Sequence, residues 1–251
     1  MSQPPLLDIQ NLVKRFGALL ATDHVSLQVQ AQEIHALIGP NGAGKTSLVA
    51  QLSGLLASDS GHIVFRGQDV TRMSTHQRVR LGLARSFQIT RLFKSFTVLD
   101  NVALSIQARM GHSFSFWKPV SREAGLTDAA MSVLNDLGLA PRAHDQASEL
   151  SHGEQRILEL GLAVATQPKL LLLDEPMAGA GPVESERILN LILKLREQSA
   201  ILLIEHDMDA VFRLADRISV LVSGAVIATG TPHEIRHHPQ VIAAYLGEES
   251  A

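Results

Sequence analysis

The sequence of 251 residues predicts an α/β fold, with a parallel sheet covered by helices, because strand and helix patterns alternate through its C-terminal half. Two further observations complete this prediction. Near the N-terminus, apolar and polar residues alternate as they do in antiparallel strands. In the middle, apolar residues recur at helical spacing. We therefore expect a core of mixed and parallel sheet with flanking helices, an antiparallel β subdomain and an inserted helical lobe.

The N-terminal elements are predicted from short-range patterns. Val25, Leu27 and Val29 fall on one face of an alternating segment. The apolar stretch IHALI precedes a Gly-rich loop and a helical pattern, and GHIVFRG alternates between two glycines. These patterns predict strands over residues 6–16, 24–30, 34–38 and 61–67 and a helix over about 45–56.

The middle of the chain predicts the helical lobe. TVLDNVALSIQARM has amphipathic spacing, and Thr97 and Asp100 could form a capping box at its start. These patterns predict helices over residues 97–110 and 122–138, with a loop over 111–121 between them. We expect a single domain, 1–251, with a core of about 1–88 and 156–251 and a helical lobe of about 89–155.

The C-terminal part predicts the parallel sheet and its closing hairpin. Ser223 and Gly224 separate two alternating segments, as a hairpin turn would. The patterns predict helices over residues 153–166, 183–198 and 240–246 and strands over 169–174, 200–204, 217–222 and 225–229.

Composition excludes several classes of protein. The net charge is −3, with no basic run, so nothing indicates a partner nucleic acid. Without cysteine there is neither a disulfide framework nor a thiolate zinc site. No apolar stretch reaches the roughly 18 residues of a membrane span, and the first residues do not resemble a signal peptide. We expect a cytoplasmic protein that reaches a membrane only through a partner.

The segment GPNGAGKT, residues 39–46, predicts a phosphate-binding loop because it joins an apolar strand to a helix. Its glycines let successive backbone N–H groups surround phosphate oxygens. Lys45 adds a positive charge for the β- and γ-phosphates, and the Thr46 hydroxyl can bind Mg²⁺. The alternative, a Gly-rich turn with no ligand, does not explain this spacing and context.

LLLLDEP, residues 170–176, is an apolar strand that ends in two acids. Because neighbouring strand residues point to opposite faces, Asp174 and Glu175 have different roles, one near Mg²⁺ and one near an attacking water. LLIEHD repeats the pattern and places His206 at the C-terminal end of another strand, where open α/β sheets bind ligands. Alone, the acids could merely end a strand, and a lone histidine is usually a surface or core residue.

Three weaker signals accompany these motifs. Gln88 follows a strand-like segment and could meet Mg²⁺ or water with its amide oxygen. Phe16 ends the first strand and could stack on adenine, although an aromatic residue there more often belongs to the core. LSHGEQR, residues 150–156, leads into a helix and forms a second plausible anion-binding end.

Taken in order, Phe16, GPNGAGKT, Gln88, LSHGEQR, LLLLDEP and His206 resemble the ATP-binding subunit of ABC transporters, and the resemblance covers nearly the whole chain. RSFQITRLFKSFTVLDNV and the ending VIAAYLGEE are similar, more narrowly, to the ATPase subunits of branched-chain amino acid importers. The resemblance implies a P-loop NTPase core, ATP and Mg²⁺ as cofactors, and ATP hydrolysis that powers import across the cytoplasmic membrane.

The resemblance assigns roles to residues. Asp174 would hold Mg²⁺ through water, Glu175 would be the general base, and His206 would position the γ-phosphate. The implied catalytic residues are Glu175, His206 and Gln88, and the implied Mg²⁺ ligands are Thr46, Gln88 and Asp174. The implied nucleotide-binding residues are Phe16, Gly39, Pro40, Asn41, Gly42, Ala43, Gly44, Lys45, Thr46, Ser47, Ser151 and Gly153.

The resemblance also implies partners. Members of the family form head-to-tail dimers in which Ser151 and Gly153 of one subunit would face the γ-phosphate held at Lys45 of the other. The second ATPase subunit could be a copy or a related chain. Transmembrane permease subunits would dock on the lobe, where Leu92 and Phe93 are expected to be exposed, unless they pack inside the lobe instead. A periplasmic solute-binding protein would act indirectly. The chain would sit on the inner face of the cytoplasmic membrane.

The chain departs from the family pattern in two segments. His152 replaces a glycine of the usual signature, Glu154 replaces a glutamine, and Gly181, after Ala180, stands where Asp or Asn is usual.

Alternative functions remain open. Related ATPases import urea, short amides or aromatic acids, or drive lipid or lipopolysaccharide extraction. A DNA-repair ATPase would need a coiled coil between Thr46 and Ser151, where only 104 residues lie. A small-molecule kinase would leave LSHGEQR and His206 unexplained.

Overall fold

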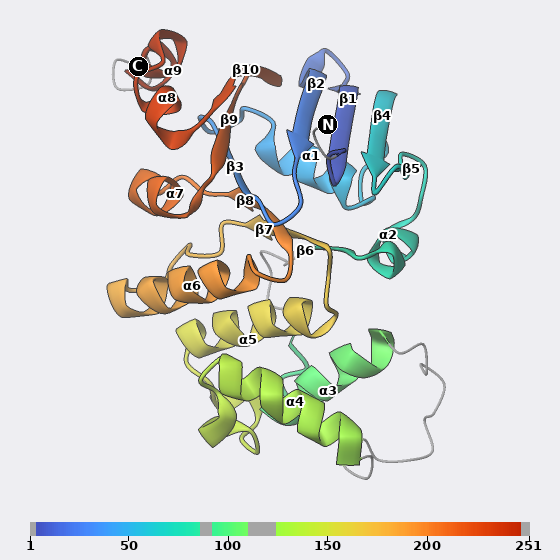
Figure 1. Ribbon diagram of the computed structural model, residues 1–251, viewed down its shortest axis with the longest axis vertical. Coiled ribbons are helices and arrows are strands. Elements are labelled where there is room, and N and C mark those ends of the chain that lie inside the picture. The colour runs from blue at the N-terminus through green and yellow to red at the C-terminus, as the bar shows by residue number, and fades with distance from the viewer. Residues whose placement is uncertain (1–3, 86–91, 110–123, 247–251) are drawn as a thin grey trace. The chain divides into compact units, whose positions relative to one another are not determined.

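The computed structural model describes residues 4–85, 92–109 and 124–246, which fall into two compact units (Figure 1). The sheet unit comprises residues 1–85, 169–175 and 196–251, and the helical unit comprises 86–168 and 176–195, in each case where described. The predicted lobe of 89–155 lies within the helical unit, which also includes residues 156–168 and 176–195.

A six-stranded mixed sheet forms the centre of the sheet unit, with strand order β10-β9-β3-β8-β7-β6 (Figure 1). The strands are β3 (Ile34–Ile38), β6 (Leu83–Arg85), β7 (Leu170–Asp174), β8 (Ala200–Ile204), β9 (Arg217–Val222) and β10 (Ala225–Gly230). All neighbours pair in parallel except β10, which returns antiparallel along β9 after the Ser223-Gly224 turn. The predicted parallel sheet and closing hairpin are therefore confirmed.

A second, antiparallel sheet has the order β2-β1-β4-β5. Its strands are β1 (Leu7–Phe16), β2 (Leu19–Val29), β4 (Ser60–Phe65) and β5 (Gln68–Asp69). Burial alternates along β2, where Val25, Leu27 and Val29 are buried on one face as predicted. This confirms the antiparallel β subdomain.

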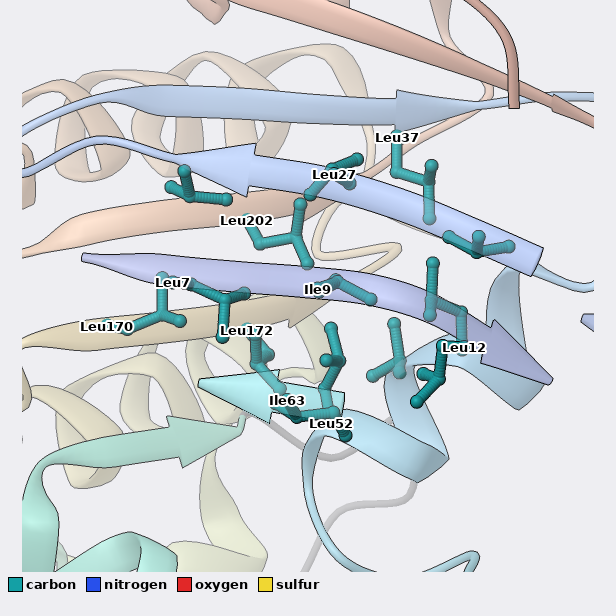
Figure 2. Packing of buried hydrophobic residues seen from close by; sticks show 14 of the residues in the cluster. Leu7, Ile9, Leu12, Leu27, Leu37, Leu52, Ile63, Leu170, Leu172 and Leu202 are labelled. Atoms are coloured by element: carbon teal, nitrogen blue, oxygen red, sulfur yellow. The ribbon is translucent and has the colours of Figure 1, made fainter. Parts of the chain in front are cut away.

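The main core of the sheet unit joins both sheets to helix α1 (Lys45–Leu52). Leu7, Ile9 and Leu12 of β1 lie among leucines of the parallel strands, such as Leu172 and Leu202 (Figure 2). These parallel strands read as unbroken apolar runs because each is buried on both faces. The core fixes the strand ends from which the motifs project.

The opposite face of the parallel sheet is covered by three short C-terminal helices, α7 (Met208–Leu214), α8 (Pro232–Arg236) and α9 (Pro239–Leu246). Ala36 and Ile38 of β3 pack here, whereas Leu37 between them faces the main core. The sequence analysis predicted α9 but not α7, α8, β5, β6 or α2 (Thr75–Leu81). All five elements are too short for their periodicity to be read in a window of 11 or more residues.

The helical unit contains α3 (Val98–Arg109), α4 (Ala124–Asp136), α5 (His152–Ala165), α6 (Pro182–Leu195) and two 3₁₀ turns, η2 (Ala140–Arg142) and η3 (Ala147–Glu149). The predicted start of α3 is confirmed, because the Thr97 hydroxyl accepts a hydrogen bond from the Asp100 N–H at 3.0 Å. The loop predicted over 111–121 lies outside the described residues. Every helix within the described ranges is too short or too polar to cross a bilayer.

A buried polar network ties β3 to β9 and β10. His35 is fully buried, with Nδ1 2.9 Å from a Glu33 carboxylate oxygen and Nε2 2.9 Å from the Ser219 hydroxyl. Ser219 in turn lies 2.7 Å from the Thr229 hydroxyl. Burial raises the pKa of Glu33, but the hydrogen bonds from His35 and from the Gln30 N–H outweigh burial and hold that pKa below its usual value. The network therefore favours an ionised carboxylate inside the sheet unit.

Candidate nucleotide-binding site

Three predicted motifs follow three adjacent parallel strands, with β8 between β3 and β7. The phosphate loop follows β3, Asp174 and Glu175 end and follow β7, and His206 comes shortly after β8. Because parallel strands share one direction, their carboxyl ends meet at the same edge of the sheet, which is where open α/β sheets bind ligands. The fold therefore gathers these side chains from positions up to 167 residues apart, from Gly39 to His206.

The phosphate loop depends on glycine for its shape. Gly44 caps α1 in the left-handed conformation, with φ of 104°, and a β-carbon there would overlap the Ala21 carbonyl oxygen. A β-carbon on Gly39 would likewise overlap the Leu221 carbonyl oxygen. No side chain caps the start of α1, and the N-terminus of a helix is a favourable place for an anion.

Lys45 is almost fully buried in this loop. Its Nζ donates hydrogen bonds to the carbonyl oxygens of Gly39, at 2.5 Å, and Pro40, at 2.9 Å. The ammonium group is thus held across the loop, against the two carbonyl oxygens that directly follow β3. Thr46 is exposed and Ser47 half-buried at the start of α1, where their hydroxyl groups are available to a ligand.

The two acids after β7 have different environments. The Asp174 side chain is only 3% exposed, and its Oδ2 accepts a hydrogen bond from Arg85 Nη2 at 2.8 Å. Glu175 is half-buried and has φ of 49°, a left-handed conformation that is uncommon for a residue with a β-carbon. Local backbone strain of this kind is concentrated at functional sites.

His206 is the neighbour of Glu175 at this edge. Its Nδ1 lies 3.8 Å from a Glu175 carboxylate oxygen, which is too long for a hydrogen bond, and its side chain is 65% exposed. Asp207 follows as the N-cap of α7 and accepts hydrogen bonds from the Asp209 and Ala210 N–H groups. The cap fixes the backbone immediately after His206 and leaves the imidazole open to solvent.

Phe16 lies at the end of β1, 48% exposed. The Lys14 ammonium group lies 5.5 Å from the centre of its ring. Lys14 is itself held by Asp59 at 2.8 Å, and its hydrogen bond keeps the pKa of Asp59 below the usual value. An exposed ring beside a fixed cation suits stacking of a nucleobase better than core packing.

Two of the remaining predictions concern residues 88–93. Gln88 lies outside the described residues. The prediction that Leu92 is exposed is wrong, because Leu92 is only 8% exposed. Phe93 is 57% exposed and lies 5.3 Å, between ring centres, from the exposed Phe96. Burial of the Leu92 side chain is favourable because it removes apolar surface from water.

Ser151 and Gly153 belong to the helical unit, at the start of α5. Ser151 is the N-cap: its hydroxyl accepts from the Glu154 N–H at 3.3 Å, and Glu154 accepts from the Ser151 N–H at 2.9 Å. Glu154, which departs from the family pattern, therefore completes a capping box. Gly153 has a packing role as well, because a β-carbon there would overlap the Glu184 side chain.

Sequence reasoning missed two arginines near these residues. Arg85 pairs with Asp174 across 89 positions, and Arg142 contacts Asp145, Glu154 at 3.4 Å and the Glu149 carbonyl oxygen at 3.2 Å. Arg85 and Asp174 lie far apart in the sequence, so no periodicity or motif could have identified their pair. Arg142 and Asp145 are only three residues apart, but they lie at a short 3₁₀ turn, which has no readable periodicity.

Comparison with known proteins gives the family. A family model described as "ABC transporter" matches residues 22–178, well over half of the chain. The chain belongs to the ABC transporter family. A second family model, "Branched-chain amino acid ATP-binding cassette transporter", matches residues 225–251.

Relatives of this ABC transporter chain match over almost their full length. The high-affinity branched-chain amino acid transport ATP-binding protein LivG of Escherichia coli K12 is 44% identical over 99% of this chain and 100% of its own. The corresponding protein BraF of Pseudomonas aeruginosa is 39% identical over 97% of this chain and 98% of its own.

Solved structures of ABC transporter cassettes have the same fold. A crystal structure of the ADP conformation of an ATP-binding cassette has a TM-score of 0.86 and 31% identity, over 98% of this chain and 100% of that one. A nucleotide-free cassette has a TM-score of 0.84 and 32% identity, over 96% and 99%. The predicted P-loop NTPase fold and the predicted family are confirmed. The chain is an ATP-binding and ATP-hydrolysing subunit of a transporter.

Proposed function

We propose that this chain powers the import of branched-chain or closely related amino acids across the cytoplasmic membrane. The observation that carries the solute class is the match of residues 225–251 to the branched-chain amino acid cassette model, beyond the match to ABC transporters in general. The names of LivG and BraF, which are similar over the full length, support the same class of solute.

ATP would bind at the carboxyl edge of the parallel sheet. The N–H groups of residues 39–47 would surround the phosphates, with Lys45 Nζ leaving the loop carbonyls to meet the β- and γ-phosphates. Phe16 would stack on the adenine. Gln88 would sense the γ-phosphate and the metal.

The residues present fit Mg²⁺. Within the described residues no cluster of three or more metal-binding side chains exists, and Mg²⁺ does not need one, because it binds one or two protein oxygens together with phosphate oxygens and water. The Thr46 hydroxyl and the Asp174 carboxylate would supply such oxygens, and we propose Gln88 as a third donor. When bound, the ion would neutralise charge on the transferred phosphoryl group.

Glu175 would act as the general base. Its carboxylate would take a proton from the attacking water as the water's oxygen forms a bond to the γ-phosphorus and the bond to the β-phosphate oxygen breaks. His206, 3.8 Å from that carboxylate, would donate a hydrogen bond to the γ-phosphate and orient it. The products are ADP and phosphate.

The two separate anion-binding ends would belong to one composite site. We propose that Ser151 and Gly153 of a second ATPase subunit, a copy or a related chain, complete the γ-phosphate site at Lys45. Each subunit alone would lack half of the donors, so ATP would close the dimer and hydrolysis would release it. Transmembrane permease subunits would receive this motion at the membrane's inner face, and a periplasmic binding protein would deliver the solute to them.

Transport assays test this proposal. The chain, purified with the membrane proteins that accompany it, is placed in vesicles and given labelled leucine, isoleucine, valine, urea or phenylalanine. We expect ATP-dependent uptake of the aliphatic amino acids, and none when Glu175→Gln replaces the native chain. Uptake of urea or aromatic acids alone would reassign the solute, and transfer of lipid without any solute uptake would reject import.

A further inference from the structure

We propose that Arg85 is a positioning residue for Asp174: it holds this carboxylate in the metal-free protein, and its charge limits how strongly the same carboxylate attracts Mg²⁺. The inference rests on the proposed role of Asp174 as a metal ligand. It adds a residue that neither the sequence motifs nor the comparisons assign.

The geometry places Arg85 and Asp174 on one face of neighbouring strands. β6 pairs in parallel with β7, with Arg85 opposite Leu172, so Asp174 is two residues further along the same face. Arg85 Nη2 donates to Asp174 Oδ2 at 2.8 Å, and the two side chains are 10% and 3% exposed. A fixed guanidinium group that donates a hydrogen bond to a buried carboxylate holds the orientation of that carboxylate.

The other end of the Arg85 guanidinium group reaches the phosphate-loop helix. Nη1 lies 3.4 Å from the hydroxyl of Ser53, the residue that caps the C-terminus of α1. The partial negative charge at that helix end favours a cation. Arg85 thus connects the end of α1, the helix that begins with Lys45, to the Asp174 carboxylate, which is the proposed Mg²⁺ ligand.

Arg78 shows what a purely structural arginine looks like in the same unit. It is 2% exposed and donates to four backbone carbonyl oxygens, those of Gln51, Leu52, Thr71 and Met73. Arg85 instead directs its charge at an acid of the site, and its buried Nε finds no acceptor among the described residues. Its placement is therefore explained by Asp174 better than by backbone anchoring.

The positive charge of Arg85 affects how strongly Asp174 attracts Mg²⁺. In the metal-free protein Arg85 offsets the desolvated Asp174 carboxylate, which would otherwise be a costly buried charge. A second cation that uses the same carboxylate is repelled by the guanidinium group. Removing the Arg85 charge should therefore strengthen the coupling between Mg²⁺ and ATP.

The test is the ratio of ATP dissociation constants in EDTA and in saturating Mg²⁺, measured at equilibrium in the full chain with Glu175→Gln to prevent turnover. Arg85→Met, which is neutral and unbranched, should raise this ratio about 3- to 10-fold. Arg85→Lys, which keeps the charge, should leave it within about 2-fold of the parent. Arg78→Lys should lower the thermal unfolding midpoint without changing the ratio.

The outcomes separate the two proposals. An unchanged or lower ratio in Arg85→Met overturns the inference, because the guanidinium charge would then not limit the attraction between the Asp174 carboxylate and Mg²⁺. If Arg85→Met does not fold, Arg85→Gln serves as the neutral variant with the same expectation. Absence of ATP binding by the parent in both conditions would instead reject the proposed nucleotide site.

Discussion

Ser151 has two roles that can be separated experimentally. Its hydroxyl caps α5 within its own chain, and we propose that it also faces the γ-phosphate of a partner. Ser151→Ala removes the acceptor of the 3.3 Å hydrogen bond from the Glu154 N–H and should lower the free energy of unfolding by about 1 kcal/mol. Ser151→Asp preserves a good N-cap and should cost less than about 0.5 kcal/mol.

The Ser151→Asp variant nevertheless brings a negative charge to the proposed phosphate contact. At about 4 Å and an effective dielectric constant of 20, two unit charges interact by about 4 kcal/mol, an upper limit of about 10³-fold in affinity. Association driven by ATP should thus be lost while the folded chain remains stable. A capping box of the same type exists at the start of α8, where Thr231 is the N-cap and Glu234 completes the box.

The assay combines urea denaturation with sedimentation velocity. Ser151→Asp and Thr231→Asp are compared in the Glu175→Gln background, with ATP, alone and with the ATPase subunit that accompanies the chain. Both variants should unfold at nearly the same urea concentration as the parent, and only Ser151→Asp should stay dissociated. ATP-driven association of Ser151→Asp equal to that of Thr231→Asp would refute the composite site.

Three further outcomes are expected. Lys45→Ala should weaken ATP binding about 10- to 100-fold by calorimetry, since a charge-assisted hydrogen bond contributes about 1.5–3 kcal/mol, and unchanged affinity would contradict the phosphate loop. Gly44→Ala should destabilise the chain by more than about 3 kcal/mol, because φ is 104° and the β-carbon overlaps a backbone oxygen, whereas Gly67→Ala, with φ of 76° and open space, should cost about 1–2 kcal/mol in the same urea titration. Because the folded pKa of Glu33 lies below the unfolded value of 4.5, its stabilisation is complete above that pH and is lost as the pH falls through the folded pKa. Glu33→Gln should therefore reduce the urea midpoint at pH 7, and its deficit relative to the parent should shrink as the pH falls below 4.5; a deficit that stays equal down to the lowest pH at which the chain folds would reject this linkage.

The sequence by itself predicted the elements whose signals are local. Gly39 to Thr46 form a pattern because backbone N–H groups can turn inward only where glycines allow it. The buried strands at 170–174 and 200–204 are apolar runs, so they too were readable. The short α7 and α8, with 7 and 5 residues, were not, because two turns of helix carry too little periodicity.

Only the tertiary structure decided which residues far apart in the sequence are in contact and which side chains are buried. Leu92 proved buried, and Arg85 proved to pair with Asp174, although 89 positions separate them. Such contacts depend on how strands are ordered in a sheet and how side chains pack between elements. Local sequence specifies which residues favour a strand, a cap or a phosphate loop, whereas long-range pairing is selected by burial of the whole core, and no single segment contains that information.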